Sequence, residues 1–149
     1  MANLATHEPR PQNAAVRVVL GAALGAGKQF AWGTIPSTLA DDGDVVEAIV
    51  LDAGSSIPGA TTTRTPVGAL SVRLDERNQH EPDRDERQIL VLATSARPLG
   101  LQLRRELERF CTLTYEARGK NVHITGWENA AYASDTLTRA RFDFARASG

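Results

Sequence analysis

The chain has 149 residues, 42% of them hydrophobic and 23% charged, which suits one compact domain with a buried core. Its formal net charge is −1, so total charge indicates neither a nucleic-acid partner nor a membrane surface. The single cysteine, Cys111, excludes an intramolecular disulfide and a zinc site built from cysteines. The most apolar stretch, residues 14–26, is too short to span a bilayer, and the N-terminus lacks a signal-peptide pattern. We therefore expect a cytoplasmic protein with no membrane partner.

The first third of the chain divides where its composition changes. Residues 1–13 contain two prolines and no periodicity, which predicts a flexible arm. Residues 14–44 place two β-prone runs around a glycine-rich segment and predict a hairpin extension, ahead of a domain at 45–147. Within that domain, residues 45–52 have apolar side chains at both odd and even positions, as in a central strand that is covered on both faces. Residues 64–74 alternate between apolar and polar, as in a half-buried strand.

The remainder predicts one helix among further strands. A long polar hairpin at 75–88 leads to an apolar run at 89–93, and residues 98–110 repeat leucine at helical spacing. Strand-like segments follow at 111–117, 121–127 and 137–145. This order predicts a mainly β fold: a five-stranded OB-fold barrel with one helix, plus an extra N-terminal hairpin. A small α+β sandwich is the alternative.

No arrangement of catalytic or cofactor-binding residues stands out. The segment GAALGAGKQ (21–29) lacks the first glycine and the closing hydroxyl of a phosphate-binding loop. The acidic residues between 41 and 52 lack calcium-loop spacing and are better explained by an acidic turn that leads into a strand. Neither the three histidines nor Cys111 has a nearby partner that suggests a nucleophile and its base. We therefore expect a protein that is not an enzyme, with no cofactor and no metal site.

Basic side chains lie on or beside the predicted strands, and aromatic side chains end one strand and occupy the hairpin extension. Basic groups that follow phosphates, together with rings on which bases stack, are what single-strand binding needs. The sequence thus predicts nine nucleic-acid-binding residues: Arg64, Arg73, Arg118, Lys120, Trp127, Arg139, Arg141, Trp32 and Phe30.

The order of segments resembles the bacterial single-stranded DNA-binding protein (SSB) family over about residues 45–147. The resemblance is carried by the turn TPVG followed by ALSVRL (65–74), the hairpin at 75–88, the helix PLGLQLRRELERF (98–110), and ARGKNVHITGW (117–127). It implies an OB-fold, single-stranded DNA or RNA as partner, and self-association into dimers or tetramers. A diverged member would serve DNA replication, DNA repair or a mobile element, and would be nucleoid-associated.

The acidic hairpin supports a different function. Residues 75–88 carry six acidic side chains against three arginines and no aromatic residue, so this loop would repel phosphates. The alternative is therefore an OB-fold module that binds another protein and no nucleic acid. Salt-dependent binding to oligonucleotides would distinguish the first function from the second.

Overall fold

The computed structural model describes residues 16–21, 30–53, 57–75 and 86–149. Six strands and two helices occupy these residues in the order β1 (Val16–Leu20), β2 (Phe30–Ile35), β3 (Val46–Leu51), β4 (Thr61–Asp75), β5 (Glu86–Ala93), α1 (Leu101–Ala117), β6 (Asn121–Glu128) and α2 (Ala130–Ser148). The mainly β class expected from the sequence is confirmed. The more specific expectation of a barrel with one helix is not met, because α2 is a second helix.

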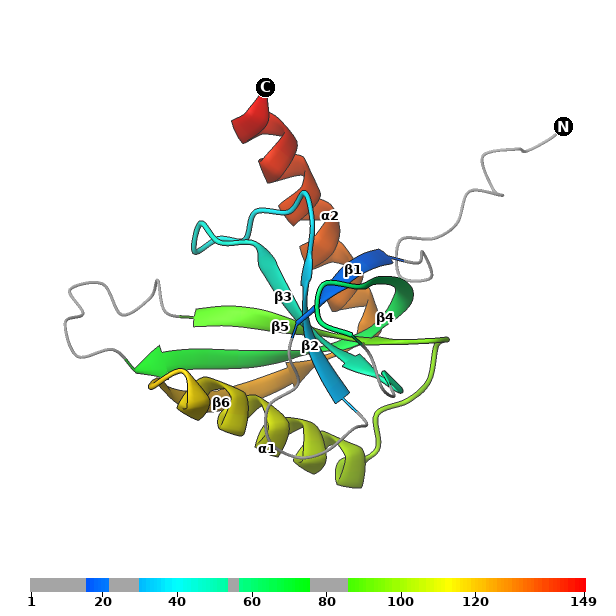
Figure 1. Ribbon diagram of the computed structural model, residues 1–149, viewed down its shortest axis with the longest axis vertical. Helices are drawn as coiled ribbons and strands as arrows, with labels where there is room; N and C mark the ends of the chain where they lie inside the picture. Colours follow the sequence, from blue (N-terminus) through cyan, green and yellow to red (C-terminus); the bar gives the residue numbers. More distant parts are fainter. Residues whose placement is uncertain (1–15, 22–29, 54–56, 76–85) are drawn as a thin grey trace, which may run out of the picture.

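The described strands form one curled sheet in the order β1-β2-β3-β5-β4-β6 (Figure 1). Since β1 also pairs with β4, the strands β1, β2, β3, β5 and β4 close into a ring, and β6 extends the sheet beyond β4. Strands β3 and β5 run parallel, whereas the other pairs are antiparallel. The parallel pair brings the start of β5 next to β3 although the two lie far apart in sequence.

Strand β3 is buried on both faces, by packing that includes α1 on one face and α2 on the other. On β3, Ile49 and Leu51 belong to the apolar cluster that includes Phe110 of α1. Ala48 and its neighbours of the same parity belong to the cluster that includes Leu137 of α2. Successive side chains of a strand point to opposite faces, so a strand covered on both faces is apolar on both parities. This explains why the start of the predicted domain, Glu47 apart, is apolar at both odd and even positions.

Strands β1 and β2 pair antiparallel, with Gly33 of β2 opposite Leu20 of β1. A Cβ atom at Gly33 would lie 2.7 Å from Cγ2 of Val18 and 2.9 Å from the backbone oxygen of Val19, so no side chain fits there. Both strands also pair with the rest of the sheet, β1 with β4 and β2 with β3. The predicted arm at 1–13 lies outside the described residues, and the division into an arm, an extension and a domain stays a prediction.

The segment 137–145, expected to be a strand, is part of α2, and that expectation is wrong. Asn129 caps the helix, because its side-chain oxygen accepts a backbone N–H of the first turn at 2.9 Å. The side chains that face the sheet recur at helical spacing: Ala133, Leu137 and Ala140. The misleading two-residue alternation came from Phe142 and Phe144, which are exposed where α2 projects beyond the sheet (Figure 1).

Helix α1 is longer than predicted and includes the segment 111–117, which had a strand-like composition. Its buried face continues the leucine spacing through Cys111, Thr114 and Tyr115. The hydroxyl of Thr114 donates to the backbone oxygen of Phe110 at 2.8 Å, which satisfies this polar group inside the helix. The threonines of this segment favour strands on propensity alone, and packing against the sheet overrides that preference.

Candidate functional site

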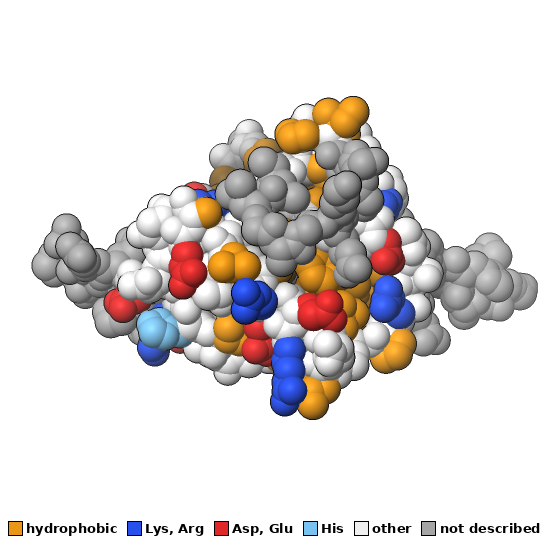
Figure 2. Space-filling view, turned by 60° about the horizontal axis from the view of Figure 1, so that its bottom comes forward, with side chains coloured by type: hydrophobic (Ala, Val, Ile, Leu, Met, Phe, Trp, Pro, Cys, Tyr) orange, Lys and Arg blue, Asp and Glu red, His pale blue; other side chains and the backbone are white. Residues whose placement is uncertain are grey.

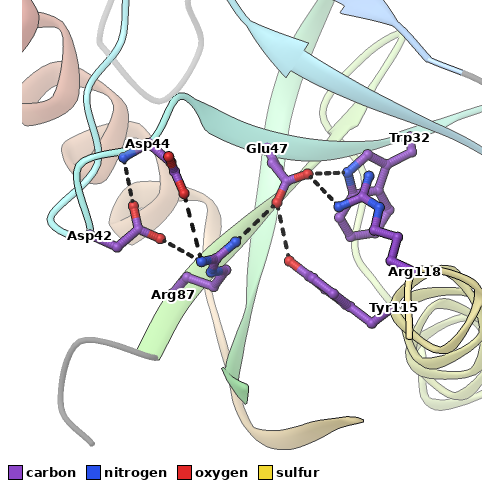
Figure 3. Close-up of polar contacts among 7 residues, drawn as sticks. All are labelled: Trp32, Asp42, Asp44, Glu47, Arg87, Tyr115 and Arg118. Atoms are coloured by element: carbon purple, nitrogen blue, oxygen red, sulfur yellow. Dashed lines mark hydrogen bonds and ion pairs between the residues drawn. The ribbon is translucent and has the colours of Figure 1, made fainter. Parts of the chain in front are cut away.

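Seven side chains form a polar group where β3, β5 and the C-terminal end of α1 meet (Figure 3). Its members come from β2, the turn before β3, β3 itself, β5 and the end of α1: Trp32, Asp42, Asp44, Glu47, Arg87, Tyr115 and Arg118. We call this group the Glu47 cluster. Its members are spread from β2 to the end of α1, so the cluster exists only once the sheet has formed.

The turn that carries the two aspartates is fixed by its own hydrogen bonds. The backbone N–H of Ala40 donates to Asp44 O at 2.7 Å, and that of Gly43 donates to Ala40 O at 2.9 Å. Gly43 has a φ of +88°, a left-handed conformation that favours glycine. The backbone N–H of Asp44 donates to Oδ1 of Asp42 at 3.0 Å. One carboxylate oxygen of Asp42 therefore holds the turn, and the other is directed at Arg87.

Glu47 is the centre of the cluster and accepts four side-chain hydrogen bonds. Trp32 Nε1 and Arg118 Nη1 donate to its Oε2 at 2.6 and 3.1 Å. Tyr115 Oη and Arg87 Nη1 donate to its Oε1 at 3.1 and 3.4 Å. A carboxylate offers about four acceptor sites, so each has a donor. The Glu47 side chain is 13% exposed, and its buried charge is compensated by these donors.

Arg87 lies among three carboxylates. Its Nη2 is 3.1 Å from Oδ2 of Asp42 and 3.9 Å from Oδ2 of Asp44, and its Nη1 is 3.4 Å from Oε1 of Glu47. Burial lowers the pKa of Arg87, but the attraction of Tyr115, Asp42 and Glu47 outweighs burial and raises that pKa above its ordinary value. Arg87 is therefore a permanent cation within this acidic group.

Aromatic rings line the side of the cluster that faces α1. Trp32 meets Tyr115 edge to face, with centroids 5.5 Å apart, and the Arg118 guanidinium lies 5.4 Å from the Trp32 ring and 5.6 Å from the Tyr115 ring. Burial raises the pKa of Tyr115, and the charge of Glu47 raises it further. The phenol therefore stays protonated over the whole physiological pH range, and its O–H donates a hydrogen bond to Glu47.

A cavity of about 260 Å³ adjoins the cluster between the turn before β3, the start of β5, and α2. Asp42 and Arg87 line it from the cluster, and Tyr132 and Arg139 line it from α2. Arginine guanidinium groups bind phosphate and carboxylate oxygens through paired hydrogen bonds. A cavity of this size has room for a small ligand, which would meet two guanidinium groups in the wall and also the carboxylates of Asp41, Asp42, Glu86 and Asp143.

Within the part of the chain that the structure describes, no group of three or more His, Cys, Asp or Glu side chains is arranged to hold a metal ion. The three carboxylates of the cluster converge on Arg87, which supplies the positive charge between them.

The structure distributes the nine predicted nucleic-acid-binding residues over most of the fold. They lie on β2 (Phe30, Trp32), on β4 (Arg64, Arg73), just after α1 (Arg118, Lys120), on β6 (Trp127) and on α2 (Arg139, Arg141). Trp32 and Arg118 are brought together at the Glu47 cluster. On the face shown in Figure 2, basic side chains are separated by acidic and apolar ones, and they form no continuous basic track.

The three aromatic residues predicted to stack on bases are buried or half-buried in the structure. Phe30 and Trp32 are 7% and 3% exposed and pack against Phe110, so neither ring offers a face to a ligand in solution. Trp127 is half-buried, and its Nε1 donates to Glu108 Oε2 at 2.7 Å. These rings contribute to the apolar cluster beneath α1.

Sequence reasoning missed five members of the cluster: Asp42, Asp44, Glu47, Arg87 and Tyr115. The sequence predicts an acidic turn that leads into a strand for the three acids, which describes their backbone correctly and says nothing of where their side chains meet. The available signal was the spacing, because two acids on a turn and a third on the following strand can face one point. Arg87 gave no local signal, since the parallel pairing of β3 and β5 is what brings it there.

The lone thiol of the chain lies beneath the cluster and provides a probe of its integrity. Cys111 is fully buried, and burial raises the pKa of Cys111 to about 12, with Glu47 adding to the effect. Because the unfolded chain releases this proton at lower pH, its contribution to stability is intact below pH 9 and is lost as the pH rises towards 12. We expect no reaction with a thiol reagent at pH 8 until denaturant is added. The alkaline loss of stability should be smaller in Cys111→Ala, whereas rapid labelling of the folded protein would contradict the burial.

Comparison with known proteins identifies the family. The family model described as inorganic pyrophosphatase matches residues 7–144. The inorganic pyrophosphatase of Rickettsia bellii is 29% identical over 118 residues, covering 71% of this chain and 63% of the relative, and that of Thermus thermophilus is 32% identical with the same coverage. The crystal structure of the Thermus thermophilus protein matches with a TM-score of 0.70 at 20% identity, covering 88% of this chain and 91% of that one. In the sequence alignments the chain spans somewhat less than two thirds of these relatives.

These matches overturn the functional predictions. The resemblance to the SSB family is wrong, and with it the DNA- or RNA-binding partner and the expectation of a protein that is not an enzyme. The alternative, a protein-binding OB-fold module, does not fit either. The resemblance rested on segment order, and its last strand is the helix α2. The family match also includes the two N-terminal strands that the resemblance left out. The chain belongs to the inorganic pyrophosphatase family.

Proposed function

We propose that this chain hydrolyses inorganic pyrophosphate to two phosphate ions at the Glu47 cluster. Its family membership supports the reaction, and the position of Arg87 supports the location. Arg87 contacts the carboxylates of the cluster and also lines the adjoining cavity. A substrate in that cavity would therefore meet a phosphate-binding cation and a carboxylate at the same point.

Two arginines would bind the substrate. Pyrophosphate is a small polyanion, and a guanidinium group binds two oxygens of a phosphoryl group at once. Arg87 would take oxygens of the phosphoryl group inside the cavity. Arg118, whose side chain is 40% exposed, lies on the other carboxylate oxygen of Glu47, outside the lining of the cavity, and would take oxygens of the substrate that extend beyond it. Both arginines are held by Glu47, so the main role of Glu47 is to position them.

A carboxylate would activate the attacking water. Asp44 is the most exposed of the three acids, with 70% of its side chain accessible and a distant ion pair to Arg87. In the proposed step, water attacks one phosphorus atom and the bond from that phosphorus to the bridging oxygen breaks. Asp44 takes a proton from the water, and the leaving phosphate takes one up from solvent. Arg87 and Arg118 stabilise the negative charge that builds up on the phosphoryl oxygens.

Divalent cations commonly join carboxylates to substrate phosphates in phosphoryl-transfer sites. Carboxylate oxygens of the kind that Mg²⁺ prefers are present in Asp42, Asp44 and Glu47. In this structure, however, Glu47 already accepts four donors and Arg87 lies between the acids. The donor set as it is arranged here does not fit a divalent ion, and no step of the proposed reaction passes through one.

The proposal is tested by phosphate release from pyrophosphate, measured once with EDTA and once with MgCl₂. We expect release above the buffer rate, and a loss of about tenfold or more in kcat/KM for Arg118→Gln, which corresponds to about 1.4 kcal/mol of binding to the transition state. The control is Arg97→Gln, because Arg97 is also partly exposed but pairs with Asp52 away from the cluster. No release in either buffer, or equal losses in both variants, would overturn the proposal.

No helix in the described ranges is both long and apolar enough to cross a membrane. A cytoplasmic location is retained as a proposal. Nucleoid association and self-association were both inferred from the SSB resemblance, and they lose their basis with it.

A further inference from the structure

The proposed function leaves one feature of the Glu47 cluster unexplained: its three carboxylates surround the guanidinium group of Arg87. Oxygens of Asp42, Asp44 and Glu47 lie 3.1, 3.9 and 3.4 Å from the terminal nitrogens of Arg87. The backbone of Arg87 is held in the sheet opposite Val72 of β4, which fixes the origin of the side chain. Figure 3 shows the guanidinium group between the turn and Glu47, in contact with acids from both.

The charge of the cluster requires a cation at this point. Three carboxylates face two guanidinium groups, and the ion pair of Arg118 is with Glu47. Asp42 and Asp44 therefore share Arg87 as the cation in contact with them among the described residues. The Asp42 side chain is 7% exposed, so without Arg87 it would be a nearly buried and uncompensated charge. A site of that kind takes up a proton or another cation.

The hydrogen-bonding capacity of the Arg87 guanidinium group is only partly used. Its Nε is buried and has no hydrogen-bond partner within the described structure, and its contact with Asp44 is long. The guanidinium group is therefore held mainly by charge and less by a full set of hydrogen bonds. A compact divalent cation prefers the same hard carboxylate oxygens and would compete for them.

We propose that Arg87 occupies the position of a divalent cation in the Glu47 cluster and thereby suppresses binding of such cations to Asp42, Asp44 and Glu47. Removing the guanidinium group creates a divalent-cation site from residues already in place. The proposal concerns the cluster without substrate, so it is tested independently of pyrophosphate hydrolysis.

The test is titration of the full-length chain with Mn²⁺, followed by the loss of the free-ion signal in electron paramagnetic resonance. We expect Arg87→Gln to bind Mn²⁺ at least about tenfold more tightly than wild type. Arg87→Lys keeps the charge and should behave like wild type, as should the distant control Arg97→Gln. Adding Asp42→Asn to Arg87→Gln should remove the gain, because it removes one of the oxygens that would hold the ion.

Two results would overturn the proposal. One is a folded Arg87→Gln, verified by circular dichroism, that binds Mn²⁺ no better than wild type. The other needs no Arg87 variant: wild type that already binds Mn²⁺ in the micromolar range, with that binding lost in Asp42→Asn. The second measurement keeps the proposal falsifiable if Arg87→Gln does not fold. In either result, phosphate release from pyrophosphate by the wild-type chain would leave the proposed function standing.

Discussion

Replacing Glu47 with glutamine is expected to lower the free energy of unfolding by about 3 kcal/mol, the cost of removing one partner from a buried ion pair. The change preserves the shape of the side chain and removes its charge. It leaves Arg87 and Arg118 without their shared anion. It also brings an amide N–H₂ group towards donors, since Trp32 and Tyr115 both donate to Glu47. An N–H₂ group that meets other donors cannot be satisfied in a site with little access to water.

Urea unfolding measures this effect, and Glu106→Gln is the matched control because Glu106 is exposed on α1. The control should change stability by no more than about 0.5 kcal/mol, as is usual for exposed positions. Hydrolysis of pyrophosphate should fall sharply in Glu47→Gln at temperatures where the variant is still folded, because both proposed phosphate-binding arginines lose their anchor. A stable Glu47→Gln with unchanged unfolding would show that the four contacts contribute little.

Truncating Trp32 is expected to have an effect of similar size for a different reason. Trp32→Ala removes a buried ring that packs on Phe110 and Tyr115 and leaves a large cavity, which typically costs about 3–5 kcal/mol. It also removes the Nε1 donor of Glu47 and the ring beneath Arg118. Trp32→Phe keeps much of the packing and loses the donor, so it should cost about 1–3 kcal/mol.

The second tryptophan provides the control for this series. Trp127 is half-buried, and its Nε1 donates to Glu108, so Trp127→Phe removes the same type of hydrogen bond at a site where water can replace it. We expect Trp127→Phe to cost about 1 kcal/mol or less. Equal losses in Trp32→Phe and Trp127→Phe would mean that the donor to Glu47 has no special importance.

The two predictions together describe how the site depends on the core. Trp32 and Tyr115 belong to the apolar cluster beneath α1 and also donate to Glu47, so the polar cluster is built on the edge of that core. A change in the core is therefore expected to reach the arginines through Glu47. A rise in KM for pyrophosphate in Trp32→Phe, with the fold intact, would be the kinetic sign of this coupling.

Much of the secondary structure was predictable, because side-chain periodicity records which faces are buried. The strands found as β3, β4, β5 and β6 were expected within a few residues of their observed ends, and so was the first half of α1. The failure at 137–145 has a specific cause. Over nine residues a two-residue alternation of phenylalanine and charged residues fits a strand, although Phe142 and Phe144 are exposed on a helix. Nothing local to that segment shows which face the rest of the fold will cover.

Most of the candidate site could not be predicted from the sequence, and its individual residues show why. Trp32 and Arg118 were singled out for stacking and phosphate contact, and the structure brings them together on Glu47. Asp42 and Asp44 were seen as a turn, which they are. What the sequence could not indicate was Arg87, because it lies in a segment with an excess of acids and was counted as part of an acidic hairpin.

The sequence by itself determined a mainly β chain, the approximate bounds of β3, β4, β5 and β6, and the first half of its long helix, since these depend on local alternation and spacing. Only the tertiary structure decided that the last segment is a helix and that a guanidinium group lies among three carboxylates. Both outcomes depend on contacts between residues far apart in the chain: α2 against the sheet, and the parallel pairing of β3 with β5. A net charge of −1 for the whole chain gave no sign of this cluster, because charges of both signs cancel in the total and act on one another only when folding brings them together.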